Sequence, residues 1–145
     1  MRVTVLNGPN LNLLGQREPA VYGSTTFAEL EALVRAEADA LGIDLTWYQS
    51  NHEGMLVDAI QALPSTADAL ILNAGAFTHT SLAIRDALLA VQVPFIEVHL
   101  SNPLARDAAR HHSMTADLSA GLIAGLGPAG YRLALQGLHD RFRGS

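Results

Sequence analysis

Short apolar, β-forming runs alternate along this sequence with longer segments of helical periodicity, and this alternation constrains the fold more than any other feature. The apolar runs lie at residues 3–6, 43–48, 67–72 and 93–98. The segments between them carry apolar residues every three or four positions, which is typical of helices that cover a surface on one side. Strands that read as nearly continuous apolar runs belong to parallel sheets, whose helical crossovers cover both faces. The pattern therefore predicts an α/β fold with a parallel sheet and helices on both of its faces.

Residues that begin or end helices occur at the borders of the periodic segments. Thr26, with Glu29 three positions later, has the pattern of a capping box, and Gly42 is expected to end the helix that starts there. Pro64 is expected to end a second helix, because proline has no N–H for the helical ladder. Ser81 is expected to cap a third helix.

The C-terminal third of the chain supplies the remaining elements. We expect a short helix at about 104–111, a segment of small residues at 121–127 and a last helix at about 129–138, with a polar tail at 139–145 that frays. With the four apolar runs, this favours a flavodoxin-like, doubly wound, five-stranded parallel sheet in the order 2-1-3-4-5. A length of 145 residues fits a single domain, 1–145.

The chain has no cysteine, and all nine of its basic residues are arginine. The absence of lysine excludes a Schiff-base mechanism, ordinary anchoring of pyridoxal phosphate and a P-loop. The absence of cysteine excludes disulfides, thiol nucleophiles and iron–sulfur clusters. No Gly-x-Gly-x-x-Gly motif follows the first apolar run, so the sequence does not support a dinucleotide site.

Fourteen acidic residues against nine basic ones give a formal charge of −5. This balance argues against a nucleic-acid partner, since binding to phosphates requires many cations. No run of about 18 apolar residues occurs, so we expect no membrane span. The first residues enter β-type sequence directly, without the apolar stretch of a signal peptide, and we therefore expect a cytoplasmic protein.

Clusters of polar residues follow each of the first four apolar runs, at 7–22, 49–53, 73–81 and 97–102. Ligands of open parallel sheets bind beyond the carboxyl ends of the strands. The four loops are therefore expected to converge on one rim and form a site for a small polar ligand. The stretch 7–23 is also longer than about 12–15 residues, and loops of that length are usually functional or disordered.

Glu97 and His99 lie two positions apart, and so on one face of a strand. The pair fits either a structural ion pair or a histidine whose tautomer and charge are held by a carboxylate for catalysis, and taken alone both interpretations stay open. His79 could join the pair in a metal site with two histidines and one carboxylate. No HxxxH, HExxH or His-x-His spacing appears, which favours a metal-free acid/base site.

Four long motifs give the chain a specific likeness to a known family. They are NGPNLNLLG at 7–15, QSNHEG at 49–54, NAGAFTHTS at 73–81 and EVHLSN at 97–102. The likeness continues through Arg17, Tyr22, Arg106, Arg110, Ser113 and Tyr131. Together these features resemble the type II 3-dehydroquinate dehydratases over nearly the whole chain. The resemblance implies a flavodoxin-like fold, conversion of 3-dehydroquinate to 3-dehydroshikimate and water in the shikimate pathway, no cofactor and no metal, and a dodecamer of four trimers.

The resemblance also implies catalytic roles for five residues. Tyr22 is the base, acting as a phenolate, and the guanidinium of Arg17 lowers the pKa of that phenol. Removal of the proton leaves an enolate, whose oxygen Asn10 holds directly or through a water. His99, oriented by Glu97, donates a proton to the departing hydroxyl. The loop 10–22 is expected to close over the site as a lid.

The substrate-binding residues implied by the resemblance lie mainly in the third and fourth clusters. They are Asn73, Gly75, Ala76, His79, Leu100, Ser101 and Arg110. Among these, the backbone amides of Leu100 and Ser101 suit the substrate carboxylate. Asp86 resembles a residue that reaches the site of a neighbouring subunit, which would make the site complete only in the assembled trimer.

Two other kinds of function stay open on sequence grounds. The chain could be a flavodoxin-like binding or assembly module without chemistry, although such a decayed site would be expected to lose one of Arg17, Tyr22, Glu97 and His99. A metal-assisted hydrolase would require a stoichiometric metal. The sequence does not distinguish a role in aromatic biosynthesis from one in quinate breakdown, because both use the same reaction.

Overall fold

A five-stranded parallel sheet forms the centre of the molecule, in the order β2-β1-β3-β4-β5. The computed structural model describes residues 1–143 except 17–19 and 21–22. The strands are β1 (Arg2–Asn7), β2 (Asp44–Gln49), β3 (Ala69–Asn73), β4 (Phe95–His99) and β5 (Gly121–Ala124). The predicted strand order and the predicted fold class are both confirmed.

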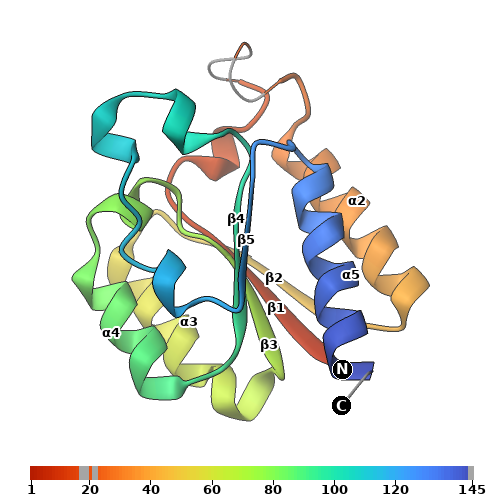
Figure 1. The fold of residues 1–145 in the computed structure, drawn as a ribbon. Helices are drawn as coiled ribbons and strands as arrows, with labels where there is room; N and C mark the ends of the chain where they lie inside the picture. Colours follow the sequence, from red (N-terminus) through yellow and green to blue (C-terminus); the bar gives the residue numbers. More distant parts are fainter. Residues whose placement is uncertain (17–19, 21–22, 144–145) are drawn as a thin grey trace.

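Helices cover both faces of the sheet (Figure 1). They are α2 (Phe27–Leu41), α3 (Glu53–Thr66), α4 (Leu82–Val91) and α5 (Ala129–Arg143). Helices α2 and α5 pack together on one face, and α3 and α4 pack together on the other. None of the helices in the described residues has the length and apolar character that crossing a membrane requires.

Strand β3 is apolar from Ala69 to Leu72 because its two faces belong to different cores. Ala69 and Ile71 of β3 pack into the core beneath α2 and α5. Leu70 and Leu72, the alternate residues of the same strand, pack into the core beneath α3 and α4. Successive side chains of a strand point to opposite faces, so a sheet covered on both sides needs apolar residues at both parities.

The predicted helix caps are present. Thr26 Oγ1 accepts a hydrogen bond from the N–H of Glu29 at 3.1 Å and begins α2, and Gly42, with φ of 68°, ends it. Ser81 Oγ accepts from the N–H of Ile84 at 2.9 Å and begins α4. Such caps each contribute about 1 kcal/mol to stability.

Two predicted helix ends are wrong. Helix α3 continues past Pro64 to Thr66, because Ser65 and Thr66 close the last turn through their side chains, whose hydroxyls donate to the carbonyl of Ala62 at 3.2 and 2.9 Å. Helix α5 continues to Arg143, beyond the predicted end at 138. Phe142 packs against the core beneath α2 and α5, which favours the extra turn.

The segments between β4 and α5 also differ in detail from the prediction. In place of one short helix at 104–111 there are two 3-10 turns, Pro103–Ala105 and Ala108–Arg110. The small-residue segment 121–127 begins with the edge strand β5. Both differences leave the loop after β4 at the carboxyl edge of the sheet, where the site lies.

Candidate active site

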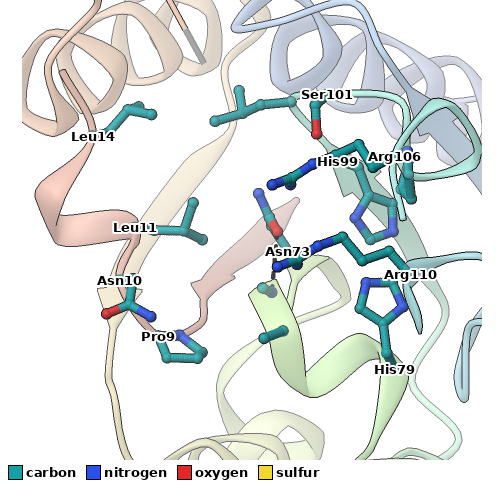
Figure 2. A pocket seen from close by; sticks show the side chains of 14 residues that line it. Pro9, Asn10, Leu11, Leu14, Asn73, His79, His99, Ser101, Arg106 and Arg110 are labelled. Carbon is teal, nitrogen blue, oxygen red and sulfur yellow. Dashed lines mark hydrogen bonds between the residues drawn. The ribbon is translucent and has the colours of Figure 1, made fainter. Parts of the chain in front are cut away.

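A pocket opens at the carboxyl edge of the sheet, beside the point where strand order reverses between β1 and β3. It is formed by the segments that follow β1, β3 and β4. Its lining residues are Pro9, Asn10, Leu11, Leu14, Asn73, Gly75, Ala76, His79, His99, Leu100, Ser101, Pro103, Arg106 and Arg110. Figure 2 shows the loop after β1 on one side, His79, His99 and both arginines on the other, and Asn73 between them.

Two glycines allow the loops after β1 and β3 to touch beside the pocket. A Cβ on Gly8 would lie 2.1 Å from the carbonyl oxygen of Ala74, so only glycine fits there. Gly75 has φ of 59°, and a Cβ on it would lie 3.1 Å from the carbonyl oxygen of Pro9. The N–H of Gly8 donates to the carbonyl of Asn73 at 2.7 Å, which joins the two loops directly.

The polar cluster after β2 supports the loop after β1 and does not line the pocket. Asn51 Oδ1 accepts from the N–H of Asn10 at 3.0 Å. Gln49 Nε2 donates to Asn51 Oδ1 at 3.0 Å and to the carbonyl of Gly8 at 3.2 Å. Residues 49–53 therefore meet the loop after β1 at the rim, but the expectation that they form part of the ligand site is wrong. Asn10 has φ of 67°, a conformation that asparagine tolerates, and these contacts hold it there.

Glu97 and His99 form a buried pair at the end of β4. His99 Nε2 donates to Glu97 Oε2 at 2.8 Å, and the two residues are 9% and 1% exposed. Ser113 Oγ donates to Glu97 Oε2 at 3.0 Å, and Thr115 Oγ1 donates to Glu97 Oε1. Burial by itself raises the pKa of Glu97, but the hydrogen bonds from His99, Thr115 and Ser113 outweigh it and hold the pKa below its ordinary value. The carboxylate therefore remains ionised and orients the ring of His99, which lines the pocket.

His79 is oriented by a backbone group instead of a carboxylate. The carbonyl oxygen of His112 lies 2.8 Å from Nδ1 and can only accept, so Nδ1 carries the proton. In a neutral ring Nε2 is then an acceptor. The rings of His79 and His99 are stacked, with centroids 6.5 Å apart and planes inclined by 17°.

The other polar groups of the pocket offer both charge and directed hydrogen bonds. Arg106 and Arg110 bring two permanent positive charges, and Arg110 Nε donates to Asp107 Oδ1 at 2.9 Å. The amide of Asn73 is almost wholly buried at the floor. A ligand that carries a carboxylate and several hydroxyls suits this lining.

Nine of the thirteen predicted site residues line this pocket, and Glu97 is hydrogen-bonded to one of them, His99. Asp86 is exposed on α4 and does not line the pocket of its own chain. Arg17 and Tyr22 lie outside the described residues. Within the described part of the chain, no group of three His, Asp or Glu side chains is arranged to hold a metal ion.

Sequence reasoning missed three groups that build the site. Ser113 and Thr115 hold Glu97, and Tyr131 contacts Asn73 through its hydroxyl. Ser113 and Tyr131 are among the residues that carry the family resemblance, but the sequence analysis assigned them no function. Local patterns could not have assigned one, because each meets its partner only through the tertiary fold.

The fold and the pocket define a doubly wound α/β protein with a polar site, lined by two histidines and two arginines, at the carboxyl edge of its sheet. The family model described as "Dehydroquinase class II" matches residues 1–139. The chain belongs to this family, and it is therefore an enzyme, a type II 3-dehydroquinate dehydratase.

Individual relatives agree with the family match. The chain is 54% identical to "Catabolic 3-dehydroquinase 1" of Neosartorya fischeri over 141 residues, which cover 97% of this chain and 94% of the relative. It is 52% identical to a "3-dehydroquinate dehydratase" of a Synechococcus strain over 143 residues, 99% of this chain and 98% of the relative. The crystal structure of the type II dehydroquinase from Butyrivibrio crossotus is similar with a TM-score of 0.93 and 42% identity, covering 95% of this chain and 97% of that one.

Proposed function

We propose that this enzyme converts 3-dehydroquinate to 3-dehydroshikimate and water by acid/base elimination through an enolate, with no cofactor. The observation that carries this proposal is the buried Glu97–His99 pair on the wall of a pocket lined by arginines and amides. A proton is removed from the carbon next to the ketone, and a hydroxyl leaves from the neighbouring carbon. Such a reaction needs one base, one acid and a group that holds the enolate oxygen.

His99 acts as the acid. The ring donates through Nε2 to Glu97, so Nδ1 is the nitrogen left to serve the substrate. The Glu97 carboxylate accepts this hydrogen bond whether the ring is neutral or charged. It therefore keeps the ring in place while Nδ1 gives its proton to the departing hydroxyl. Ser113 and Thr115 occupy further lone pairs of Glu97 and restrict its own movement.

Tyr22 acts as the base, and Arg17 stabilises its phenolate. This assignment rests on the motif likeness and on the absence of lysine from the chain, since an imine cannot activate the substrate here. Asn10 lines the pocket at the start of the same loop and holds the enolate oxygen. We propose that residues 10–22 close over the bound substrate and exclude water from the phenolate.

The remaining lining residues bind the substrate. The amides of Leu100 and Ser101 bind its carboxylate, and Asn73, His79 and Arg110 bind its hydroxyls, while Gly75 and Ala76 shape the wall; all of these line the pocket. Asp86 reaches into the active site of a neighbouring subunit within a dodecamer of four trimers. Its exposed position on α4, away from the pocket of its own chain, is consistent with that role. The compartment we propose is the cytoplasm.

The direct test is to add 3-dehydroquinate to the purified enzyme and follow the ultraviolet absorbance of the conjugated enone product. We expect absorbance to rise, and to rise at the same rate after treatment with EDTA, or with borohydride in the presence of substrate. A loss of rate with EDTA would revive a metal-assisted reaction, and a stable protein that forms no enone would contradict the proposal. The relatives include catabolic 3-dehydroquinases and 3-dehydroquinate dehydratases, so this assay tests the reaction that both pathways share.

A further inference from the structure

We propose that Tyr131 of α5 is a positioning residue that fixes the orientation of the Asn73 amide, so that Asn73 presents an N–H donor to the substrate. The proposal rests on the proposed function in one respect, the role of Asn73 in binding substrate. It assigns a purpose to a buried hydroxyl that the acid/base chemistry does not use. The argument depends on a chain of hydrogen bonds that joins four elements.

The chain of hydrogen bonds runs from β2 through β1 and α5 to β3. Asn7 Nδ2 donates to the carbonyl oxygen of Tyr48 at 3.2 Å. The Tyr131 hydroxyl donates to Asn7 Oδ1 at 2.7 Å and accepts from Asn73 Nδ2 at 2.9 Å. Asn73 Oδ1 accepts from the N–H of Gly75 at 3.2 Å.

The direction of every bond in this chain is determined by its two ends. The carbonyl of Tyr48 can only accept, so Asn7 must turn its NH2 toward β2 and its oxygen toward Tyr131. The N–H of Gly75 can only donate, so Asn73 must turn its oxygen toward Gly75 and its NH2 toward Tyr131. The hydroxyl of Tyr131 both donates and accepts, and it is the one group that makes the two orientations compatible.

Burial prevents water from taking over the role of this hydroxyl. Asn7 and Tyr131 are 0% exposed and Asn73 is 4% exposed. Asn7 and Asn73 are paired across β1 and β3, and Tyr131 reaches both from α5. Burial raises the pKa of the Tyr131 hydroxyl well above its ordinary value, more than the hydrogen bond from Asn73 lowers it, so the hydroxyl remains protonated and keeps donating to Asn7.

The consequence for the pocket is a donor at a defined point of its floor. One hydrogen of Asn73 Nδ2 is bound to Tyr131, and the second has no protein acceptor among the described residues. Asn73 lies between the two walls of the pocket in Figure 2. The second hydrogen therefore suits an acceptor oxygen on the substrate, and a ligand that offers only a donor there is disfavoured.

The experiment is a double-mutant cycle between Tyr131→Phe and Asn73→Ala, read as substrate KM and kcat. Tyr131→Phe keeps the ring, which packs on Trp47 with centroids 5.8 Å apart, and removes only the hydroxyl. We expect it to raise KM about tenfold with kcat changed less than about threefold. In the Asn73→Ala background the same change should raise KM less than about threefold, because the group it positions is gone. Ile60→Val, in the core on the other face of the sheet, is the control for a general loss of stability.

An equal effect in both backgrounds, or no effect of Tyr131→Phe in the parent enzyme, would overturn the proposal. A second readout needs no activity: side-chain hydrogen exchange of Asn73 by NMR in the parent protein, with its signal assigned through Asn73→Ala. The Asn73 amide should exchange at least about tenfold more slowly in the parent protein than in Tyr131→Phe, and equal rates in the two proteins would also overturn the proposal. An inactive parent enzyme with a protected Asn73 amide would refute the proposed function and leave the orientation of Asn73 supported.

Discussion

Glu97 is the residue whose surroundings explain most about the site. A carboxylate that is 1% exposed is costly unless its lone pairs are filled, and His99, Ser113 and Thr115 fill them. The result is an ionised group that fixes one nitrogen of His99 and leaves the other for the substrate. A structural ion pair and a catalytic pair were both compatible with the spacing in sequence, and it is the position of His99 on the pocket wall that favours the catalytic interpretation.

Replacing Glu97 by Gln should slow turnover without unfolding the enzyme. The glutamine amide has the same shape as the carboxylate, but it cannot stabilise both protonation states of the His99 ring. Its NH2 group also cannot accept the hydrogen bond that is donated to the carboxylate oxygen it replaces. We expect kcat to fall by about 100-fold or more, measured from enone formation. Thermal denaturation supplies the control for folding, and a folded Glu97→Gln enzyme with the parent rate would remove Glu97 from the mechanism.

The lowered pKa of Glu97 also predicts how stability depends on pH. The folded state binds this proton more weakly than the unfolded state, so the contribution of Glu97 is complete above its ordinary pKa of 4.5 and is lost as the pH falls through the lower folded value. The parent protein should therefore lose more free energy of unfolding than Glu97→Gln between about pH 6 and about pH 3. Urea denaturation at each pH measures the difference, and parallel pH profiles would show that Glu97 is not held in its ionised form.

At the scale of elements, the carboxyl ends of β1, β3 and β4 determine where chemistry is possible. The sequence pattern predicted these strands because a parallel sheet covered on both faces needs apolar residues at both parities, and their order followed from the doubly wound architecture that the alternation favoured. It could not predict that the cluster after β2 would turn toward the backbone of the neighbouring loop, since that depends on the conformation of Asn10. It also missed Ser113, Thr115 and Tyr131. Their partners, Glu97 and Asn73, are distant in sequence and are brought close only by the tertiary fold.

The contact between the loops after β1 and β3 gives a matched pair of glycine variants. Gly8→Ala should destabilise the protein by about 2 kcal/mol or more, because the new methyl group would overlap the carbonyl of Ala74. Gly54→Ala, where a Cβ meets nothing within 4 Å in α3, should be neutral or stabilising by up to about 1 kcal/mol. Urea denaturation of both variants measures this, and equal stabilities would mean that the two loops can separate without cost.

The last turn of α5 provides a test of the corrected helix end. Phe142 is partly buried against the core, so Phe142→Ala should lower the free energy of unfolding by about 1–3 kcal/mol. Arg141→Ala, at an exposed position of the same turn, is the control and should change it by less than about 0.5 kcal/mol. A frayed tail would make both substitutions neutral, which chemical denaturation would reveal.

At the scale of the whole molecule, the proposed assembly makes each active site depend on two chains. His99 lines the pocket of its own chain, whereas Asp86 lies exposed on α4. Mixed oligomers of His99→Ala and Asp86→Ala chains would then contain some sites with both residues intact. Co-expression of the two inactive variants should restore a measurable fraction of the parent activity. Homogeneous preparations of each variant are the controls, and no recovery in oligomers proven to be mixed would contradict the role of Asp86.

The most direct measurement of the central claim is enone formation by His99→Ala on addition of 3-dehydroquinate, with the binding of a substrate analogue measured on the same preparation. The account predicts that turnover falls by about 100-fold to 10,000-fold while the analogue binds within about tenfold of its affinity for the parent enzyme. A His99→Ala enzyme that turns over at the parent rate would contradict the claim that this histidine, held by Glu97, donates the proton that lets the hydroxyl leave.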